Sequence, residues 1–254
     1  MAEWDRQADA FERHRQRSAA DFTRVLHLDA EGMVWIGTRD AGLMRRNPRT
    51  GAVVSFRHDP DDPNSLSSNI ARALLVDQSG VLWIGTWGGG LNQYDREMDT
   101  FIRYRHDPEN PFSLSHDIVR ALYEDRNGTI WVGTMAGLSK LDRDSGQFIR
   151  YQHDPGNPKS LSNNIIWSIV QDSRGVLWVG TANGLNRFDP GTEAFIRYQH
   201  DPDDPASLSN NSVRSIHEDR SGILWLGTAG GLDKFNPERA RIKTYQHDEN
   251  DPRS

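Results

Sequence analysis

A four-residue motif, Trp-x-Gly-Thr, recurs at a nearly constant spacing along this chain of 254 residues. Successive copies are 48, 48, 47 and 47 residues apart. A fixed period of about 40–50 residues is typical of β-propeller blades, which are small sheets that bury their faces by packing against neighbouring blades. The motif therefore predicts one repeat domain over residues 1–254. Its copies begin at Trp35, Trp83, Trp131, Trp178 and Trp225.

The fourth repeat contains four short runs that are rich in β-branched and aromatic residues and bounded by turn residues. They cover residues 165–171, 176–181, 184–189 and 194–200, and an Asp-x-x-Gly turn at 172–175 joins the first two. Four strands joined by hairpins form one antiparallel sheet. We therefore predict an all-β chain, a β-propeller of five four-stranded antiparallel blades. The predicted blades lie at about residues 22–58, 69–106, 117–153, 164–200 and 211–247.

Three features of the repeat indicate how the blades pack. The first strand is expected to lie innermost, because it places a small residue beside an apolar one, as in Ser168 and Ile169. The motif Trp is expected to pack between blades, with its indole N–H bonded to a partner. The motif Gly is expected to let the adjacent blade approach closely.

The N-terminal segment resembles the last two strands of a blade. Trp4 precedes Phe11 by seven residues, as Phe188 precedes Phe195, so residues 3–14 predict a half blade. The alternative is a short amphipathic helix with Trp4 and Phe11 on one face. Five blades can close into a ring, or the chain can be a fragment of a larger propeller, with an exposed apolar blade face.

Composition narrows the function classes. The formal net charge of −6 and the pI of about 5.8 argue against a nucleic-acid partner. Cys is absent, so thiolate metal sites and disulfides are excluded. The sequence holds no apolar run of the ~20 residues that a membrane span needs. Its N-terminus lacks the apolar core of a signal peptide, so the chain as written is expected in the cytoplasm.

The run Ile-x-x-Asp-x-x-Gly-x-Leu-Trp-x-Gly-Thr-x-x-Gly-Leu-x-x-Phe/Tyr-Asp resembles the two-component regulator propeller repeat, over about residues 22–248. The resemblance implies the periplasmic sensor region of hybrid histidine kinases and of some diguanylate cyclases. Such regions sense extracellular ligands, often sugars or polysaccharides. We expect a sensor module without its own output domain, and a periplasmic location for a full-length parent.

Positions at which the repeats differ are candidates for ligand specificity. One such set, the first set, lies near the start of each first strand, five residues before the turn Asp. In a closed ring it would encircle the channel mouth, where guanidinium groups suit carboxylate, sulfate or phosphate and an indole suits a sugar ring. The alternative is that each Arg pairs with a carboxylate of its own or a neighbouring blade. The first set is Arg24, Arg72, Arg120, Trp167 and Arg214.

The second set directly follows the Gly-Thr of each motif, and its variety suits an asymmetric pocket. Trp87 stands out because glycines follow it, although an ordinary loop aromatic is an equal alternative. The second set is Arg39, Trp87, Met135, Ala182 and Ala229. From it we include three residues in the predicted ligand-binding site, namely Arg39, Trp87 and Met135.

Two sequence features that could suggest a metal site are discounted. The acidic loops at 59–62 and 201–204 lack the spacing of calcium ligands. The His that ends each repeat occurs once per outer strand, so each is expected to cap its own loop rather than share a metal. We predict no metal and no cofactor. The His residues that end the repeats are His58, His106, His153, His200 and His247.

The sequence contains no nucleophile elbow, no phosphate-binding Gly loop and no His-x-x-x-His. No catalytic residue is therefore predicted. A lyase-type propeller is the remaining enzyme alternative, since streptogramin lyases, which look related, use a converging His and Glu. His116 is the best-placed His for that role, while His27 and His217 lie further along their strands.

The sequence thus favours a non-catalytic, ligand-binding sensor propeller of a two-component-type signalling system. Its expected partners are a sugar, an oligosaccharide or an anionic small molecule at the channel face, and a signalling partner or output domain. The main alternative is a protein-interaction scaffold or a propeller fragment that a partner completes.

Overall fold

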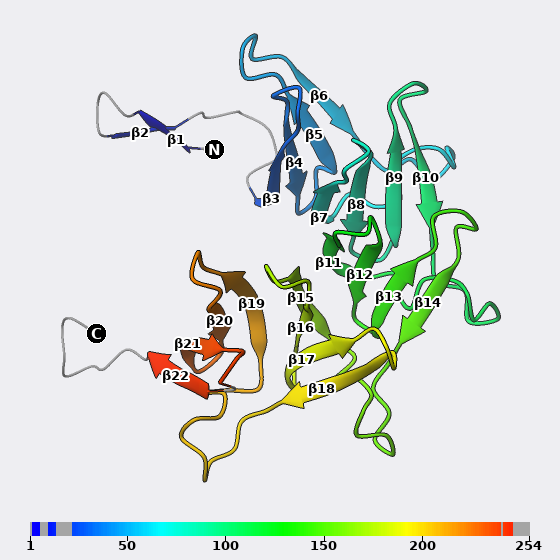
Figure 1. Cartoon of the computed structure of the whole chain (residues 1–254). Helices are drawn as coiled ribbons and strands as arrows, with labels where there is room; N and C mark the ends of the chain where they lie inside the picture. Colours follow the sequence, from blue (N-terminus) through cyan, green and yellow to red (C-terminus); the bar gives the residue numbers. More distant parts are fainter. Residues whose placement is uncertain (1, 6–9, 14–21, 240, 246–254) are drawn as a thin grey trace. The chain divides into compact units, whose positions relative to one another are not determined.

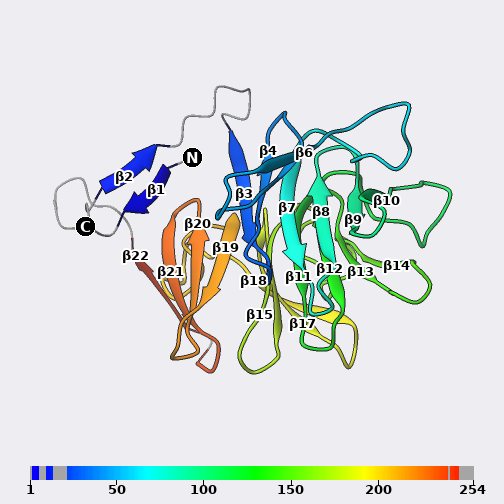
Figure 2. The same cartoon turned by 90° about the horizontal axis from the view of Figure 1, so that it is seen from above.

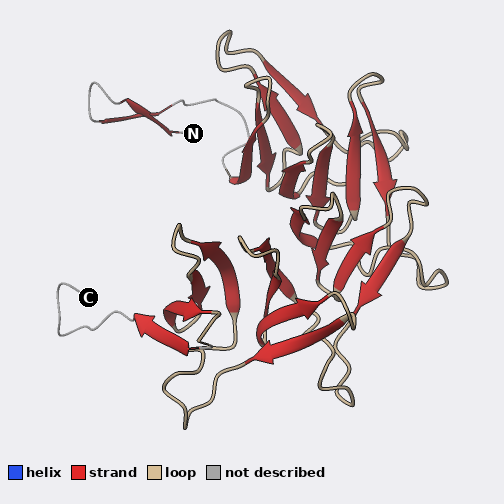
Figure 3. Cartoon of the chain, in the orientation of Figure 1, coloured by secondary structure: helices blue, strands red, loops and turns tan. Residues whose placement is uncertain are grey.

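The computed structural model describes residues 2–5, 10–13, 22–239 and 241–245. Within these ranges the structure has 22 strands and no helix (Figure 3). The strands form five four-stranded antiparallel sheets and one two-stranded sheet. This confirms the prediction of an all-β chain with five four-stranded blades.

Each four-stranded sheet is a meander whose strands pair in chain order. Blade 1 comprises β3 (Thr23–Leu28), β4 (Val34–Thr38), β5 (Leu43–Arg46) and β6 (Val53–Phe56). Blade 2 comprises β7 (Ala71–Val76), β8 (Leu82–Thr86), β9 (Leu91–Asp95) and β10 (Thr100–Tyr104). Blade 3 comprises β11 (Val119–Glu124), β12 (Ile130–Thr134), β13 (Leu138–Leu141) and β14 (Phe148–Tyr151).

Blade 4 comprises β15 (Ile166–Gln171), β16 (Leu177–Thr181), β17 (Gly184–Asp189) and β18 (Ala194–Tyr198). The observed ends lie within two residues of those predicted for the fourth repeat. Blade 5 comprises β19 (Val213–Glu218), β20 (Leu224–Thr228), β21 (Gly231–Asn236) and β22 (Arg241–Tyr245). Figure 2 shows the strands of blade 5 side by side in this order.

The chain forms two compact units. The first unit, Met1–Thr86 with Asn92–Arg103, holds blade 1 and most of blade 2. The second unit, Trp87–Leu91 with Tyr104–Ser254, holds blades 3 to 5. Within each unit, neighbouring blades meet through their first strands, because β3 contacts β7, and β15 contacts both β11 and β19 (Figure 1).

One Asp organises each motif. In blade 4, the indole Nε1 of Trp178 donates a hydrogen bond to Oδ2 of Asp172 at 2.9 Å. The other carboxylate oxygen of Asp172 accepts the backbone N–H groups of Arg174 and Val176, which closes the turn between the first two strands. The same Trp–Asp bond occurs in all five blades, at 2.8–2.9 Å. The indole partner that the sequence required is therefore the turn Asp itself.

The motif Gly permits the close approach that the sequence predicted. A Cβ atom on Gly133 of blade 3 would lie 2.6 Å from Cγ2 of Ile166 in blade 4. A Cβ atom on Gly180 of blade 4 would lie 2.6 Å from the carbonyl oxygen of Val213 in blade 5. Any side chain at these positions would therefore push neighbouring blades apart.

The loops that connect the blades are held from both sides. On the next outer strand, Arg197 donates from Nε and Nη2 to the carbonyl oxygens of Ser160 and Asn157, both at 2.8 Å. Within the loop, Nδ1 of His153 lies 2.7 Å from the carbonyl oxygen of Leu161. Equivalent His contacts of 2.6–2.9 Å occur at His58, His106 and His200, as expected for loop caps, whereas His247 lies outside the described residues.

At the N-terminus, β1 (Ala2–Asp5) pairs with β2 (Ala10–Arg13) in an antiparallel hairpin. This hairpin occupies the predicted half blade at 3–14, of which residues 6–9 and 14 lie outside the described ranges. The helical alternative is therefore wrong. Among the described residues, none lies in a helix that could cross a membrane.

Candidate functional site

The first set shares one backbone feature. Between β11 and β12, Val119 pairs with Thr134 and Ala121 pairs with Gly133, so Arg120 is the extra residue of a β-bulge. A β-bulge bends the strand and changes the direction of a side chain, and such bulges are frequent beside active sites. The other four first-set residues occupy the same bulge position, namely Arg24, Arg72, Trp167 and Arg214.

The second set lies beside these bulges. The backbone N–H of Met135 donates to the carbonyl oxygen of Ile118, two residues before Arg120, at 3.2 Å. In blade 1, the N–H of Arg39 donates likewise to Phe22, two residues before Arg24. The two sets are therefore adjacent at one end of the first two strands of a blade, although they lie about 15 residues apart in sequence.

In the second unit, Arg120 contacts two other predicted residues. The guanidinium carbon of Arg120 lies 3.5 Å from the ring centroid of Trp167, and Nη1 of Arg120 lies 3.0 Å from Sδ of Met135. All three side chains are half-buried. The Trp167 ring, which we expected to stack on a sugar, is stacked by Arg120 instead.

Two buried donors lie beside this cluster on β15. Neither Nε1 of Trp167 nor Oγ of Ser168 has a hydrogen-bond partner among the described residues. Buried polar atoms are normally satisfied, so such atoms call for an acceptor from water or a ligand. This end of β15 therefore suits a molecule that carries hydrogen-bond acceptors.

In the first unit, Arg24 and Arg72 lie close enough to interact. Burial, and then the positive charge of Arg24, hold the pKa of Arg72 below its ordinary value. Arg24 is exposed and makes no ion pair with another described residue, and the same is true of Arg214 in blade 5. At these two positions the structure does not support the alternative of a pairing carboxylate.

Arg39 and Trp87 complete the predicted set. The guanidinium carbon of Arg39 is 5.7 Å from the ring of Phe22, and the Arg39 side chain is exposed. Trp87 is 39% exposed and forms an isolated β-bridge with Ile118. The structure thus brings together Arg24 with Arg72, and Arg120 with Met135 and Trp167.

The His residues weighed for catalysis have local environments. Nδ1 of His116 accepts the backbone N–H of Ile118 at 2.9 Å, so this nitrogen serves the turn before β11. His27 is half-buried on β3, and His217 is exposed on β19. In the parts of the chain that the structure describes, no group of three His, Asp or Glu side chains could hold a metal ion.

The second unit also contains a cavity of about 430 Å³ that we did not predict, lined by β14, the following loop and the turn before β18. There the hydroxyl of Tyr151 donates to Oε1 of Glu193 at 3.1 Å, and Lys159 lines the same cavity. Glu193 has a left-handed backbone, with φ of 51°, where blade 3 has Gly146. That departure from the repeat is the sequence signal that could have found it.

Five sheets built on one repeated motif define a β-propeller repeat protein. Four segments also match the family model of the two component regulator propeller. Each segment runs from the loop before a first strand to the residue after the second set, so it includes both candidate positions. The chain carries two-component regulator propeller repeats, and the repeat around Trp35 is outside the matched segments. The matches are residues 65–88, 113–136, 160–183 and 207–230.

Solved structures share the fold. The extracellular domain of a hybrid two component system from B. thetaiotaomicron is 24% identical, with a TM-score of 0.76 over 89% of this chain and 30% of that one. The extracellular domain of a one component system from the same organism is 24% identical, with a TM-score of 0.53 over 96% and 38%. This chain therefore spans about a third of each of those structures.

An enzyme has the same fold. Virginiamycin B lyase from Staphylococcus aureus is 16% identical, with a TM-score of 0.67 over 92% of this chain and 72% of the lyase. At these identities the likeness concerns the fold alone. No curated protein matches the chain by sequence.

Proposed function

We propose that this chain is the ligand-binding sensor propeller of a two-component-type signalling system, and that it acts without catalysis. The two-component regulator propeller repeats support this proposal, as does the fold shared with extracellular domains of such systems. A full-length parent would then be periplasmic, and a signalling partner or output domain would carry the signal onward.

The ligand is a sugar or another small molecule that carries an anionic group. The observation that carries this assignment is that the variable first-set residues all occupy β-bulges, which set them outside the regular ladder. Arg24 and Arg72 are two neighbouring cations, and an anion bound between them would relieve their repulsion. Arginine also binds carboxylate, sulfate and phosphate through paired hydrogen bonds.

The second unit has a candidate site of its own. A ligand acceptor would satisfy the buried Nε1 of Trp167 and Oγ of Ser168. Arg120 would have to swing from the Trp167 ring for a sugar to stack there, which links binding to a movement of one side chain. Such a movement is the simplest change that a sensor could report.

The test is a binding titration with an acidic oligosaccharide, such as a uronic acid oligomer, and with its neutral counterpart. Arg72→Ala combined with Arg120→Ala should weaken binding of the acidic ligand roughly tenfold or more, because a hydrogen bond to a charged group is worth about 1.5–3 kcal/mol. Arg49→Ala, at an exposed turn position, is the matched control. An unchanged affinity in the double variant would contradict both candidate sites, the one in each unit.

Two alternatives have separate tests. A protein-interaction scaffold is favoured by the exposed apolar residues of blade 5, Leu232 and Tyr245, and would show a concentration-dependent sedimentation profile together with no affinity for either oligosaccharide. A lyase-type activity would require turnover that His116→Ala abolishes. The hydrogen bond from Ile118 to His116 favours a local structural role for that His.

A further inference from the structure

Adjacent blades in the second unit interlock through an aromatic socket. In blade 3, the rings of Trp131 and Tyr151 lie 5.9 Å apart at an interplanar angle of 32°. The ring of Phe188, from blade 4, lies 5.2 Å from Trp131 and 5.4 Å from Tyr151. Leu138 beside them is fully buried. A Trp, a Leu and a Tyr of one blade thus receive an aromatic ring from the next.

The same socket recurs one blade later. Trp178 and Tyr198 of blade 4 receive Phe235 of blade 5, at 5.5 and 5.1 Å. Leu185 is again fully buried. Edge-to-face contacts of this kind favour one defined arrangement of the rings and add to the free energy of burial.

Blade 5 presents the socket with no ring in it among the described residues. Trp225 and Tyr245 lie 5.9 Å apart at 33°, which is the arrangement of Trp131 and Tyr151. Leu232 and Tyr245 are nevertheless 42% and 43% exposed. The socket of blade 5 is therefore formed in advance of any occupant.

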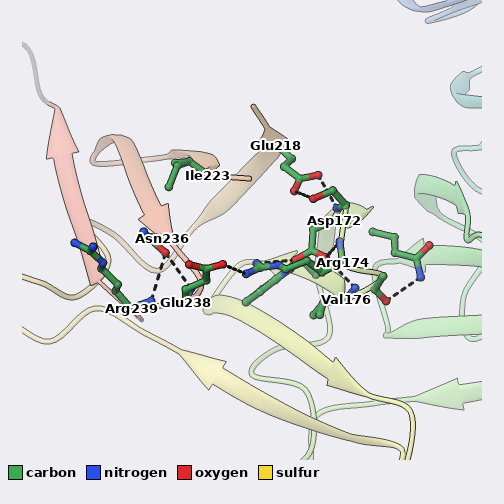
Figure 4. A network of polar contacts seen from close by, with 12 residues as sticks. Asp172, Arg174, Val176, Glu218, Ile223, Asn236, Glu238 and Arg239 are labelled. Carbon is green, nitrogen blue, oxygen red and sulfur yellow. Dashed lines mark hydrogen bonds and ion pairs between the residues drawn. The ribbon is translucent and has the colours of Figure 1, made fainter. Parts of the chain in front are cut away.

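Polar contacts also join the turn of each blade to the next blade in the second unit. In blade 4, N and Oγ of Ser173 donate to the carboxylate of Glu218 in blade 5, at 2.7 and 2.6 Å. Arg174 lies between Asp172 of its own blade and Glu238 of blade 5, as Figure 4 shows. These contacts fasten the turn of one blade to the next.

Arg220 occupies the corresponding turn position of blade 5. In blade 3, the equivalent Arg126 donates from its backbone N–H to Oε1 of Gln171 in blade 4, and from Nη2 to the carbonyl oxygen of Asp172. Arg220 is exposed and makes no hydrogen bond or ion pair with a described residue. The face of blade 5 thus offers an aromatic socket beside an available cation.

The chain itself contains a segment with the matching pattern. In the β1–β2 hairpin, Trp4 pairs in register with Phe11. In blade 4, the strand that fills a socket also has an aromatic cross-strand pair, since Phe188 pairs with Phe195, whereas Phe235 of blade 5 pairs with Ile242. The hairpin strands, AEWD and AFER, contain three acidic residues and one basic residue, which complements a cationic face.

We propose that the blade 5 face formed by Trp225, Leu232 and Tyr245 binds the β1–β2 hairpin of a second copy of this chain. Lys234 and Lys243, whose Nζ atoms lie 5.6 and 5.0 Å from the Trp225 and Tyr245 rings, join Arg220 in attracting the acidic hairpin. Each copy has one such face and one hairpin, so association is head-to-tail. The assembly does not depend on the proposed ligand site.

The test uses two full-length variants in sedimentation velocity over a concentration series. Leu232→Asp removes the socket, and Trp4→Ala combined with Phe11→Ala removes the hairpin aromatics. The wild type should associate with rising concentration, and each variant alone should stay monomeric. The two variants mixed should form a 1:1 dimer and nothing larger, because the mixture contains one intact face and one intact hairpin.

Controls keep the test decisive. Ile196→Asp, at a residue 49% exposed on β18 outside the socket, should associate as the wild type does. Arg220→Glu, at an exposed residue, should weaken association at least tenfold even if Leu232→Asp fails to fold. A monomeric wild type across the series would overturn the proposal, as would association that both the Leu232 and the Arg220 variants retain.

Discussion

The guanidinium of Arg120 in blade 3 stacks on the indole of Trp167 in blade 4, with 3.5 Å between the guanidinium carbon and the ring centroid. Both residues occupy the bulge position of their first strands. This contact therefore joins two neighbouring blades at the residues that vary between repeats. It couples the stability of the blade 3–blade 4 boundary to the candidate binding site.

Replacing Arg120 with Lys keeps the charge but removes the planar group that stacks on Trp167. We expect Arg120→Lys to lower the free energy of unfolding by about 0.5–1 kcal/mol, the usual size of a partly exposed cation–π contact. Urea denaturation measures the change. Arg49→Lys, in an exposed turn, should leave the midpoint unchanged, and an equal midpoint for both variants would contradict a stabilising stack.

The carboxylate of Asp172 accepts four hydrogen bonds at once, which makes its loss costly. Asp172→Ala leaves Nε1 of Trp178 buried without its acceptor and opens the turn, so we expect a loss of about 2–4 kcal/mol. Asp172→Asn retains one acceptor oxygen and should lose less. Chemical denaturation of both variants gives the comparison. If the alanine variant is as stable as the asparagine variant, the hydrogen bonds that Asp172 accepts do not stabilise the blade.

The turn carboxylates also predict how stability depends on pH. Burial alone would raise the pKa of Asp172, but the hydrogen bonds from Trp178, Val176 and Arg174 hold it below the ordinary 3.8. Asp29 and Asp219 are lowered as well. Because the folded state binds these protons less readily than the unfolded state, their stabilisation is present above pH 3.8 and is lost as pH falls through the lower folded values.

The measurement is the free energy of unfolding between pH 6 and pH 2. The wild type should lose stability steeply below about pH 4. Asp172→Asn should show a shallower decline, since it lacks one of the titrating groups. A wild-type curve that stays flat in this range would contradict the lowered pKa values.

The loop before blade 4 should lose protection when Arg197, the residue that clamps it, is replaced. Arg197 donates to the carbonyl oxygens of Ser160 and Asn157, and Arg197→Ala removes both bonds. We expect amide hydrogen exchange in residues 154–161 to become at least about tenfold faster, because hydrogen bonds to a charged group are worth about 1.5–3 kcal/mol. Exchange in the equivalent loop at 201–208 should stay unchanged, since blade 5 has Thr244 at the clamp position.

The blades could be predicted because the residues that determine each blade lie within one repeat. The motif Trp, the Asp-x-x-Gly turn and the alternation of apolar residues are all visible within one repeat, and the strand ends of blade 4 follow from them within two residues. Trp178 and Asp172 lie six residues apart, so their hydrogen bond was within reach of the sequence. Asp172 was nevertheless predicted only as a turn residue.

The details of the candidate site depend on pairing that no single repeat reveals. A bulge at Arg120 is a property of the register between two strands, and composition does not encode that register. The Tyr151–Glu193 pair joins two blades. Leu232 and Leu185 are the same residue in the same repeat position, yet one is exposed and the other is buried, because only a neighbouring blade decides which.

The bulge residue has one further consequence. Since it takes no part in the regular register of its sheet, its side chain can be exchanged without changing the strand pairing of its own blade. Arg and Trp already occupy it in otherwise near-identical repeats. Each duplication of a blade thus creates one position that selection can alter freely, so a propeller of this kind can acquire new recognition at single sites while its scaffold stays the same.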